Sequence, residues 1–151
     1  MKKSVEQRRR AETSRNTVAV KRRALELGFD AVGIATLEAN AHAAELDRWL
    51  TAGYAGTMTY LHRQAEKRKD PARIMPDAKV AVVTLTNYFH GPAPSPSARV
   101  AQYAWSADYH GVLGRRLERL AAVVREIAPG AKARCYVDAG PVPEQIGRAH
   151  V

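Results

Sequence analysis

Hydrophobic and polar positions follow one another in blocks that predict alternating helices and strands. A helix is predicted for TVAVKRRALELGF, beginning at Asn16 or Thr17 and ended by Gly28. The apolar run at residues 30–36 predicts a buried strand, and ANAHAAELDRWLTAG predicts a second helix that Gly53 ends. The first third of the chain is therefore expected to form helix, strand and helix.

Residues 56–78 predict a short helix followed by a long irregular connection. Pro71 and Pro76 each disfavour helix at the residue before them. A connection of this length on a compact domain is usually functional or mobile. It carries a basic cluster that includes Arg68, and this cluster predicts either a clamp for phosphate or amide-rich ligands or a solvated helix end.

The second half of the chain predicts three strands and one helix. The β-branched run at residues 79–89 is nearly continuous, so we expect a central strand there. A loop rich in Pro, Gly and Ser, a strand at 99–105 and a helix from Asp108 to Gly130 follow, and residues 132–138 predict the last strand. Helices alternating with strands indicate an α/β fold with a layered mixed sheet and flanking helices.

Composition indicates a chain that folds and that carries no thiolate site. Hydrophobic residues make up 46% and charged residues 26%, which is ordinary for a globular protein. No apolar stretch approaches the ~20 residues of a membrane span, and no signal peptide is recognisable. We therefore expect a cytoplasmic protein with no membrane partner. The single cysteine, Cys135, excludes an internal disulfide and is expected to be a small buried hydrophobe.

Positive charge is concentrated at the N-terminus. The net charge is +9, and residues 1–23 hold nine Lys and Arg against two Glu, a net +7. Residues 1–16 are expected to form a basic N-terminal extension. Such an arm either contacts a phosphate backbone or is a solvated extension, and charge alone favours the second interpretation.

The usual catalytic motifs are absent, so candidate chemistry depends on one carboxylate. The chain has no GxGxxG, GxxxxGK[ST], HExxH or GxSxG, and its five histidines show no metal-ligand spacing, so no metal site is expected. Asp138 ends the last predicted strand, where α/β sheets bind ligands. It is either a general acid that an apolar cofactor surface keeps protonated, or a turn residue before Gly140.

Four ordered segments resemble the N-terminal part of the epoxyqueuosine reductase family. They are LELGFDAVGIA, GYAGTMTYL with KRKDPARIMPDAKVAVVTLTNY, QYAWSADYHGVLGRRLERL, and YVDAGPVPE. The resemblance implies a nitroreductase-like cobalamin-binding domain at residues 17–144, incomplete here, and a ferredoxin-like domain with two 4Fe-4S clusters that is absent from the chain. It also implies reduction of epoxyqueuosine to queuosine in tRNA, an external electron donor and a monomer.

The resemblance assigns roles to three residues. Asp138 matches the family's proton donor in VD-x-GP and, held beside the corrin, is also expected to bind the cofactor. Arg68 matches a cobalamin contact in KR-x-DP, and Ala101 falls where the family's backbone approaches the corrin. Tyr109 and His110 match the family's DYH without an assigned role. The departures within the matched region, IMP at residues 74–76 and Pro143, do not touch the three site residues.

The last residues are expected to be foreign to the family. IGRAHV is what ATCGGAAGAGCACACGTC encodes, which resembles a sequencing adapter, and Gln145 fits a junction codon. Residues 145–151 are therefore predicted to be an adapter-derived tail, and the chain a truncated fragment that is inactive alone. Two alternatives stay open: a stand-alone corrinoid-binding or trafficking module, and a corrinoid protein similar to reductive dehalogenases.

Overall fold

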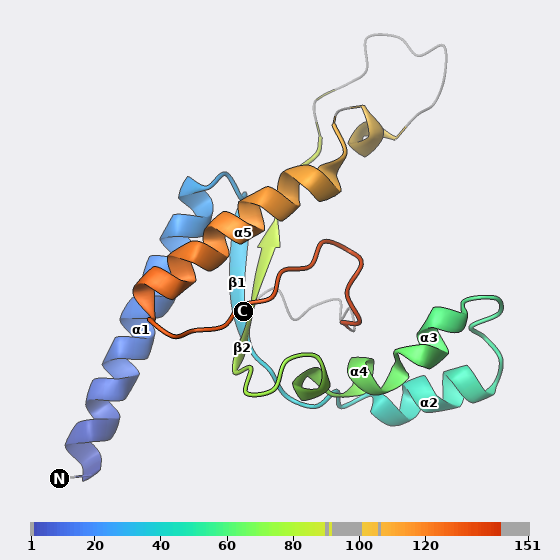
Figure 1. The fold of residues 1–151 in the computed structure, drawn as a ribbon, viewed down its shortest axis with the longest axis horizontal. Helices are drawn as coiled ribbons and strands as arrows, with labels where there is room; N and C mark the ends of the chain where they lie inside the picture. The colour runs from blue at the N-terminus through green and yellow to red at the C-terminus, as the bar shows by residue number, and fades with distance from the viewer. Residues whose placement is uncertain (1, 90, 92–100, 106, 143–151) are drawn as a thin grey trace. The chain divides into compact units, whose positions relative to one another are not determined.

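A computed structural model describes residues 2–89, 91, 101–105 and 107–142, with the side chains from Ser4 onwards. The elements follow one another along the chain, as Figure 1 shows. They are α1 (Lys2–Glu26), β1 (Ala31–Thr36), α2 (Ala43–Thr51), α3 (Thr59–Arg63), α4 (Ala65–Lys69), η1 (Pro71–Arg73), β2 (Val80–Leu85), η2 (Gln102–Ala104) and α5 (Tyr109–Ile127). The predicted loop at His90–Ala98 and the predicted tail at 145–151 lie almost wholly outside the described residues.

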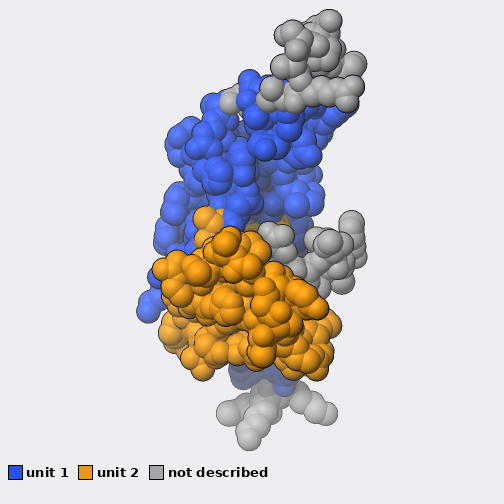
Figure 2. All heavy atoms as spheres, turned by 90° about the vertical axis from the view of Figure 1, so that its right-hand side faces the viewer, with its two compact units in different colours: residues 1–33, 84–138 blue, residues 34–83, 139–151 orange. Residues whose placement is uncertain are grey.

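The chain divides into two compact units, coloured separately in Figure 2. Unit 1 contains residues 1–33 and 84–138, and unit 2 contains residues 34–83 and 139–151. The division crosses both strands and falls again directly after Asp138. Each unit has its own small apolar core.

Unit 1 is built on the packing of α1 against α5 (Figure 1). The two helices bury Val20 and Ala24 from α1 and Leu120, Ala121 and Val123 from α5. Removing these side chains from water is the main favourable term for pairing the helices. The Arg116 guanidinium adds a hydrogen bond of 2.8 Å to the carbonyl of Gly28, just beyond the end of α1.

Unit 2 holds the second core around α2 and α4. Leu50, Ala55 and Ala65 are buried, and Leu46 and Leu61 pack against them. Lys69 at the end of α4 pairs with Glu66 and, at 3.0 Å, with Asp47 of α2. These hydrogen bonds, to Glu66 first and then to Asp47, raise the pKa of Lys69, which therefore stays charged across the physiological range.

Two predicted strands are confirmed, but the expected layered mixed sheet is not found in the described residues. β1 and β2 form a two-stranded sheet, and it is antiparallel, because Asp30 N–H donates to the Leu85 carbonyl and Leu37 N–H donates to the Lys79 carbonyl. β2 was expected to be central. Within the part of the chain that the structure describes it has one partner, and its Val80 and Leu85 are exposed.

Two predicted strands are wrong for a common reason, and one predicted irregular segment is partly helical. Gln102–Ala104, within the predicted strand at 99–105, is a turn of 3-10 helix, and residues 132–138 are extended but unpaired. A β-branched or aromatic run forms a strand only where another backbone offers a ladder of hydrogen bonds, and no described segment offers one here. The connection at 56–78 is more regular than expected, with helical turns α3, α4 and η1.

α1 begins far before the predicted N-cap at Asn16 or Thr17. It runs without interruption from Lys2, so residues 2–16 share one helix with the packed part of unit 1, and the domain boundary predicted after residue 16 stays a prediction. The residues ahead of Asn16 are mostly Arg, Gln, Glu and Ala, which favour helix, and an internal Asn does not stop it. None of the helices in the described ranges is long and apolar enough to cross a membrane.

The helix ends were predicted correctly where glycine or aspartate determines them. Gly28, Gly53 and Gly130 all have positive φ, and Asp108 caps α5 by accepting a hydrogen bond of 3.0 Å from the His110 amide. Asp70 is extended before Pro71, as a residue before proline should be, and its side chain caps η1.

Replacing Gly28 by Ala should lower the free energy of unfolding by roughly 1 kcal/mol. Gly28 has φ of +89°, a left-handed backbone conformation that is strained for a residue with a Cβ. The added methyl group would meet Arg116 only at ordinary contact distance, 3.6 Å. Gly33→Ala is the matched control, because nothing lies within 4 Å and its φ is not positive. Urea unfolding measures both variants, and equal losses would contradict the conformational explanation.

Candidate functional site

The most specific polar contact in unit 1 joins Tyr109 and Asp138. The Tyr109 hydroxyl donates a hydrogen bond of 2.6 Å to Oδ2 of Asp138. Tyr109 is the first residue of α5, so the Asp108 cap fixes the turn from which its ring projects. Asp138 has φ of +54°, one of two non-glycine residues with positive φ in the described chain. Backbone in this region often marks a functional site.

Aromatic rings continue the site away from Asp138. The Tyr109 ring stacks on His110 with centroids 4.2 Å apart, and Tyr103 meets Tyr109 edge-on at 6.2 Å. Tyr88 in turn meets Tyr103 edge-on at 6.4 Å. Tyr88 and Tyr103 are 61% and 53% exposed, so this group presents ring surface to solvent next to the carboxylate. Exposed aromatic faces of this kind suit a large planar ligand.

Two carboxylates make the site electronegative. The hydrogen bond to Asp138 raises the pKa of the Tyr109 hydroxyl, with smaller contributions from desolvation and from the charge of Asp138, so Tyr109 stays a donor at neutral pH. On the other side, His110 lowers the pKa of Asp108 through a side-chain contact of 2.8 Å and a backbone hydrogen bond. Asp108 is therefore ionised at neutral pH and holds the His110 ring against Tyr109.

The structure differs from the expected surroundings of Asp138. The sequence predicted a carboxylate at the end of a buried strand, whereas the described Asp138 is exposed and its segment is unpaired. Oδ2 accepts from Tyr109, and Oδ1 has no hydrogen-bond partner among the described residues. Asp138 thus has one oxygen fixed by the protein and one available to a ligand.

Ala101 lies in unit 1 but not in the strand that was expected to carry it. It is exposed and extended, and it precedes η2. The next residue, Gln102, donates a hydrogen bond of 2.7 Å from Nε2 to the Gly91 carbonyl. Ala101 therefore leads into the segment that holds Tyr103, although no contact between Ala101 and Asp138 is seen.

Arg68 lies in unit 2, at the end of α4. Its Nη1 donates a hydrogen bond of 3.1 Å to the Val142 carbonyl. Its Nε is buried and has no hydrogen-bond partner among the described residues, as is also true of Oγ1 of Thr86 in unit 1. A buried donor without an acceptor costs free energy, so Arg68 is suited to a ligand that brings one.

These residues fit a cobalamin better than they fit an iron-sulfur cluster. Taken unit by unit, the Arg68 Nε in unit 2, which has no hydrogen-bond partner among the described residues, suits an amide carbonyl, and the exposed tyrosine rings in unit 1 suit an apolar surface; a corrin has both features. A 4Fe-4S cluster needs about four thiolates, and the chain has one cysteine. Burial, with the charge of Glu118, raises the pKa of that Cys135 thiol. Among described residues no group of three possible metal ligands occurs.

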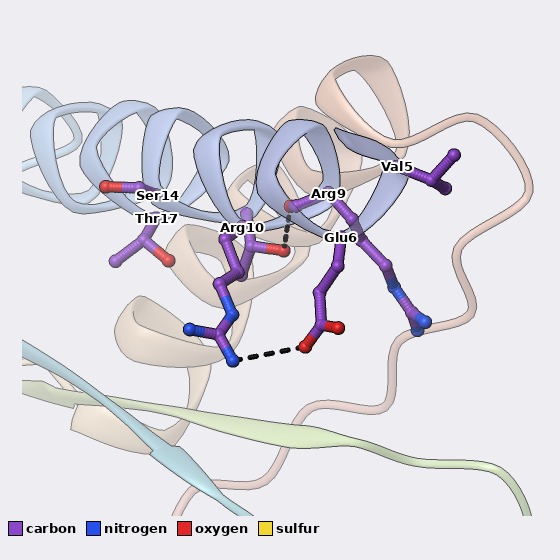
Figure 3. Close-up of a pocket in the computed structure, with 7 residues that line it drawn as sticks. Val5, Glu6, Arg9, Arg10, Ser14 and Thr17 are labelled. Atoms are coloured by element: carbon purple, nitrogen blue, oxygen red, sulfur yellow. Dashed lines mark hydrogen bonds and ion pairs between the residues drawn. The ribbon is translucent and has the colours of Figure 1, made fainter. Parts of the chain in front are cut away.

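A surface depression lies elsewhere, along the first half of α1. Figure 3 shows it bordered by side chains between Val5 and Thr17, with Arg10 and Glu6 paired at 3.1 Å. All its lining residues come from this one helix, which cannot enclose a ligand. It is therefore not a cofactor site.

Sequence reasoning gave no role to Tyr109, a member of the site, and did not single out Thr86, whose buried hydroxyl has no hydrogen-bond partner among the described residues. Tyr109 was noted without a role, because nothing local indicates that its hydroxyl reaches a residue 29 positions further along the chain. Thr86 was not noted at all. The available signal was a polar residue at the end of the apolar run of β2, where strands of α/β proteins meet ligands.

Comparison with known proteins gives one consistent result. Residues 68–139 match the family described as epoxyqueuosine reductase QueG, DUF1730. The chain is 41% identical over 131 residues to an epoxyqueuosine reductase of Gloeobacter violaceus, covering 83% of this chain and 40% of that relative. It is 37% identical over 128 residues to one from Pseudomonas aeruginosa, covering 80% and 35%. The chain thus spans well under half the length of these curated relatives.

A solved structure supports the fold. The structure of epoxyqueuosine reductase from Streptococcus thermophilus superimposes with a TM-score of 0.69 at 23% identity, over 83% of this chain and 35% of that one. The expected likeness to nitroreductase-like domains stays a prediction. Both kinds of match agree with the expected resemblance: residues 68–139 match the epoxyqueuosine reductase QueG, DUF1730 family, and over 83% and 80% of its length the chain is similar to two proteins named epoxyqueuosine reductase.

Proposed function

We propose that this chain supplies the cobalamin-binding part of an epoxyqueuosine reductase that acts on tRNA in the cytoplasm, with Asp138 as the proton donor. The observation that carries the proposal is the family match at residues 68–139, which includes Arg68, Ala101 and Asp138. The hydrogen bond between Tyr109 and Asp138 lies inside the same segment and supports an organised acid there.

The overall reaction takes up an electron pair and two protons and releases the epoxide oxygen as water, leaving the cyclopentene diol. Bound cobalamin would supply the electron pair, replenished from an external donor through 4Fe-4S clusters in the longer enzyme. The contribution of this chain is to bind the corrin, to orient the substrate and to give a proton to the oxygen as it leaves carbon.

Asp138 and Tyr109 have different parts in giving the proton to the leaving oxygen. The Tyr109 hydroxyl holds Oδ2, so the carboxyl plane is fixed and Oδ1 is the oxygen that carries the proton. Because Asp138 is exposed in the chain itself, a bound corrin and substrate would have to cover it to keep water away. Tyr109 is a positioning residue in this scheme.

Arg68 and Ala101 serve the cofactor. Nη1 of Arg68 donates to the Val142 carbonyl, which leaves the buried Nε of Arg68 to donate to an amide carbonyl of the corrin. Ala101, with no side chain beyond Cβ, lets the backbone approach the corrin closely. The enzyme is proposed to act as a monomer.

Neither alternative function is favoured. A corrinoid-trafficking module or a protein similar to reductive dehalogenases would also bind cobalamin, but the relatives reported above are named epoxyqueuosine reductase. The chain by itself is proposed to bind cobalamin without turnover, since its own residues cannot ligate the clusters.

Asp138→Asn should move the ionisation of Tyr109 to lower pH, because the carboxylate that raises the pKa of its hydroxyl is removed. Alkaline titration followed by tyrosinate absorbance measures this, with Tyr109→Phe identifying which of the six tyrosines responds. Superimposable curves for the wild type and Asp138→Asn would show that the hydrogen bond is absent in solution.

Arg68→Ala should weaken cobalamin binding by the 151-residue chain about tenfold or more, the usual effect of losing a hydrogen bond to a charged group. Absorbance titration measures it, and Arg73→Ala, in the same basic cluster but 59% exposed, should change affinity less than about twofold.

In the full-length enzyme, Asp138→Asn should reduce turnover by about a hundredfold or more while cobalamin affinity stays unchanged, because general acids contribute rate and not cofactor affinity. Single-turnover reduction of epoxyqueuosine in tRNA measures the rate. Full activity of Asp138→Asn would remove Asp138 as the acid.

A further inference from the structure

α1 carries a row of arginines on one side. Arg8, Arg15 and Arg22 are spaced by seven residues, which is close to two helical turns, so their Cα atoms lie about 10.5 Å apart along one face. Arg22 is two residues from each of the buried Val20 and Ala24, which puts it on the other side of the helix from the core. We call Arg8, Arg15 and Arg22 the arginine stripe.

The stripe is available to a partner. Arg8 and Arg15 are exposed, and within the described residues neither has a carboxylate at ion-pair distance. Arg22 is 72% exposed and makes only a long contact of 3.5 Å with Glu26. Glu12 lies between Arg8 and Arg15, on the same helix, and it forms no ion pair in the described chain. Within the described residues, the positive charge of Arg8 and Arg15 is therefore not neutralised by an ion pair.

The composition of α1 points to a polyanion in water and not to a membrane surface. A helix that lies in a bilayer needs a continuous apolar face opposite its basic one. In α1 that opposite face is polar in the first half, where Arg9 lies (Figure 3) together with Thr13, and it packs against α5 in the second half. The exposed large apolar side chains of α1 are Val5, Val18 and Leu25, and three such side chains over 25 residues do not form a continuous apolar face.

We propose that the arginine stripe of α1 binds the phosphate backbone of tRNA, at a surface distinct from Asp138 and from the 68–139 segment. The choice of tRNA as the polyanion rests on the proposed function. Guanidinium groups about two turns apart on a straight helix can each reach a different phosphate of a nucleic-acid strand. Such contacts position the RNA without selecting its sequence, so the anticodon should not matter for them.

The test measures binding of the 151-residue chain to two unmodified tRNAs with different anticodons over a range of salt concentrations. Arg8→Gln/Arg15→Gln should weaken binding of both tRNAs about tenfold at low salt and lower the slope of log affinity against log salt by about two. Glu12→Gln should act in the opposite direction and strengthen binding. Circular dichroism checks that each variant keeps its helix content.

Two matched variants separate the stripe from total charge. Arg115→Gln/Arg119→Gln removes the same charge from exposed positions of α5 and should leave affinity within about twofold. Arg8→Lys/Arg15→Lys keeps the charge and should retain most of the binding. The proposal is overturned if the α5 control weakens binding as much as the stripe variant, or if the stripe variant binds like the wild type.

Two further measurements distinguish other failures. The stripe variant should bind cobalamin like the wild type. If the wild-type chain binds no cobalamin but the stripe still controls tRNA affinity, the proposed function fails and the stripe stands. If the stripe variant loses binding to vesicles of phosphatidylserine and phosphatidylcholine but not to tRNA, the stripe is a membrane contact and the proposal is wrong.

Discussion

The first turn of α5 is the constraint on which the site in unit 1 depends. Asp108 accepts from the His110 amide and contacts the His110 ring, and this cap sets the direction in which Tyr109 leaves the helix. The Tyr109 hydroxyl then reaches Asp138 at 2.6 Å, holding the carboxyl of a residue whose backbone has positive φ. A cap that looks purely structural thus determines where an acid lies.

The site is open in the part of the chain that the structure describes. Asp138 and the rings of Tyr88 and Tyr103 are exposed, while Arg68 in unit 2 keeps a buried donor without an acceptor. Exposed aromatic surface and an unpaired buried donor are both unfavourable unless something covers them. An amide carbonyl of a ligand would satisfy the Arg68 donor in unit 2, and an apolar ligand surface would cover the tyrosine rings in unit 1.

The two halves of α1 are stabilised by different interactions. Its second half buries Val20 and Ala24 against α5, so it is held by apolar packing. Its first half has no such contact, and its stability as helix comes from residue propensity and from local pairs such as Arg10 with Glu6. The unpacked basic half is continuous with the packed half. Its charged side chains are therefore spaced regularly along one helix, which a flexible arm would not achieve.

The sequence by itself determined the local features whose cause lies within a few residues. The positive-φ glycines at the helix ends, the Asp108 cap and the extended Asp70 before Pro71 follow from chain geometry, whereas the roles that the family motifs give Asp138 and Arg68 stay predictions. The tertiary structure decided what depends on distant partners. Residues 132–138 are not a strand because no described backbone pairs with them. Tyr109 joins the site because folding brings together residues 29 apart, a proximity that no pattern along the chain encodes.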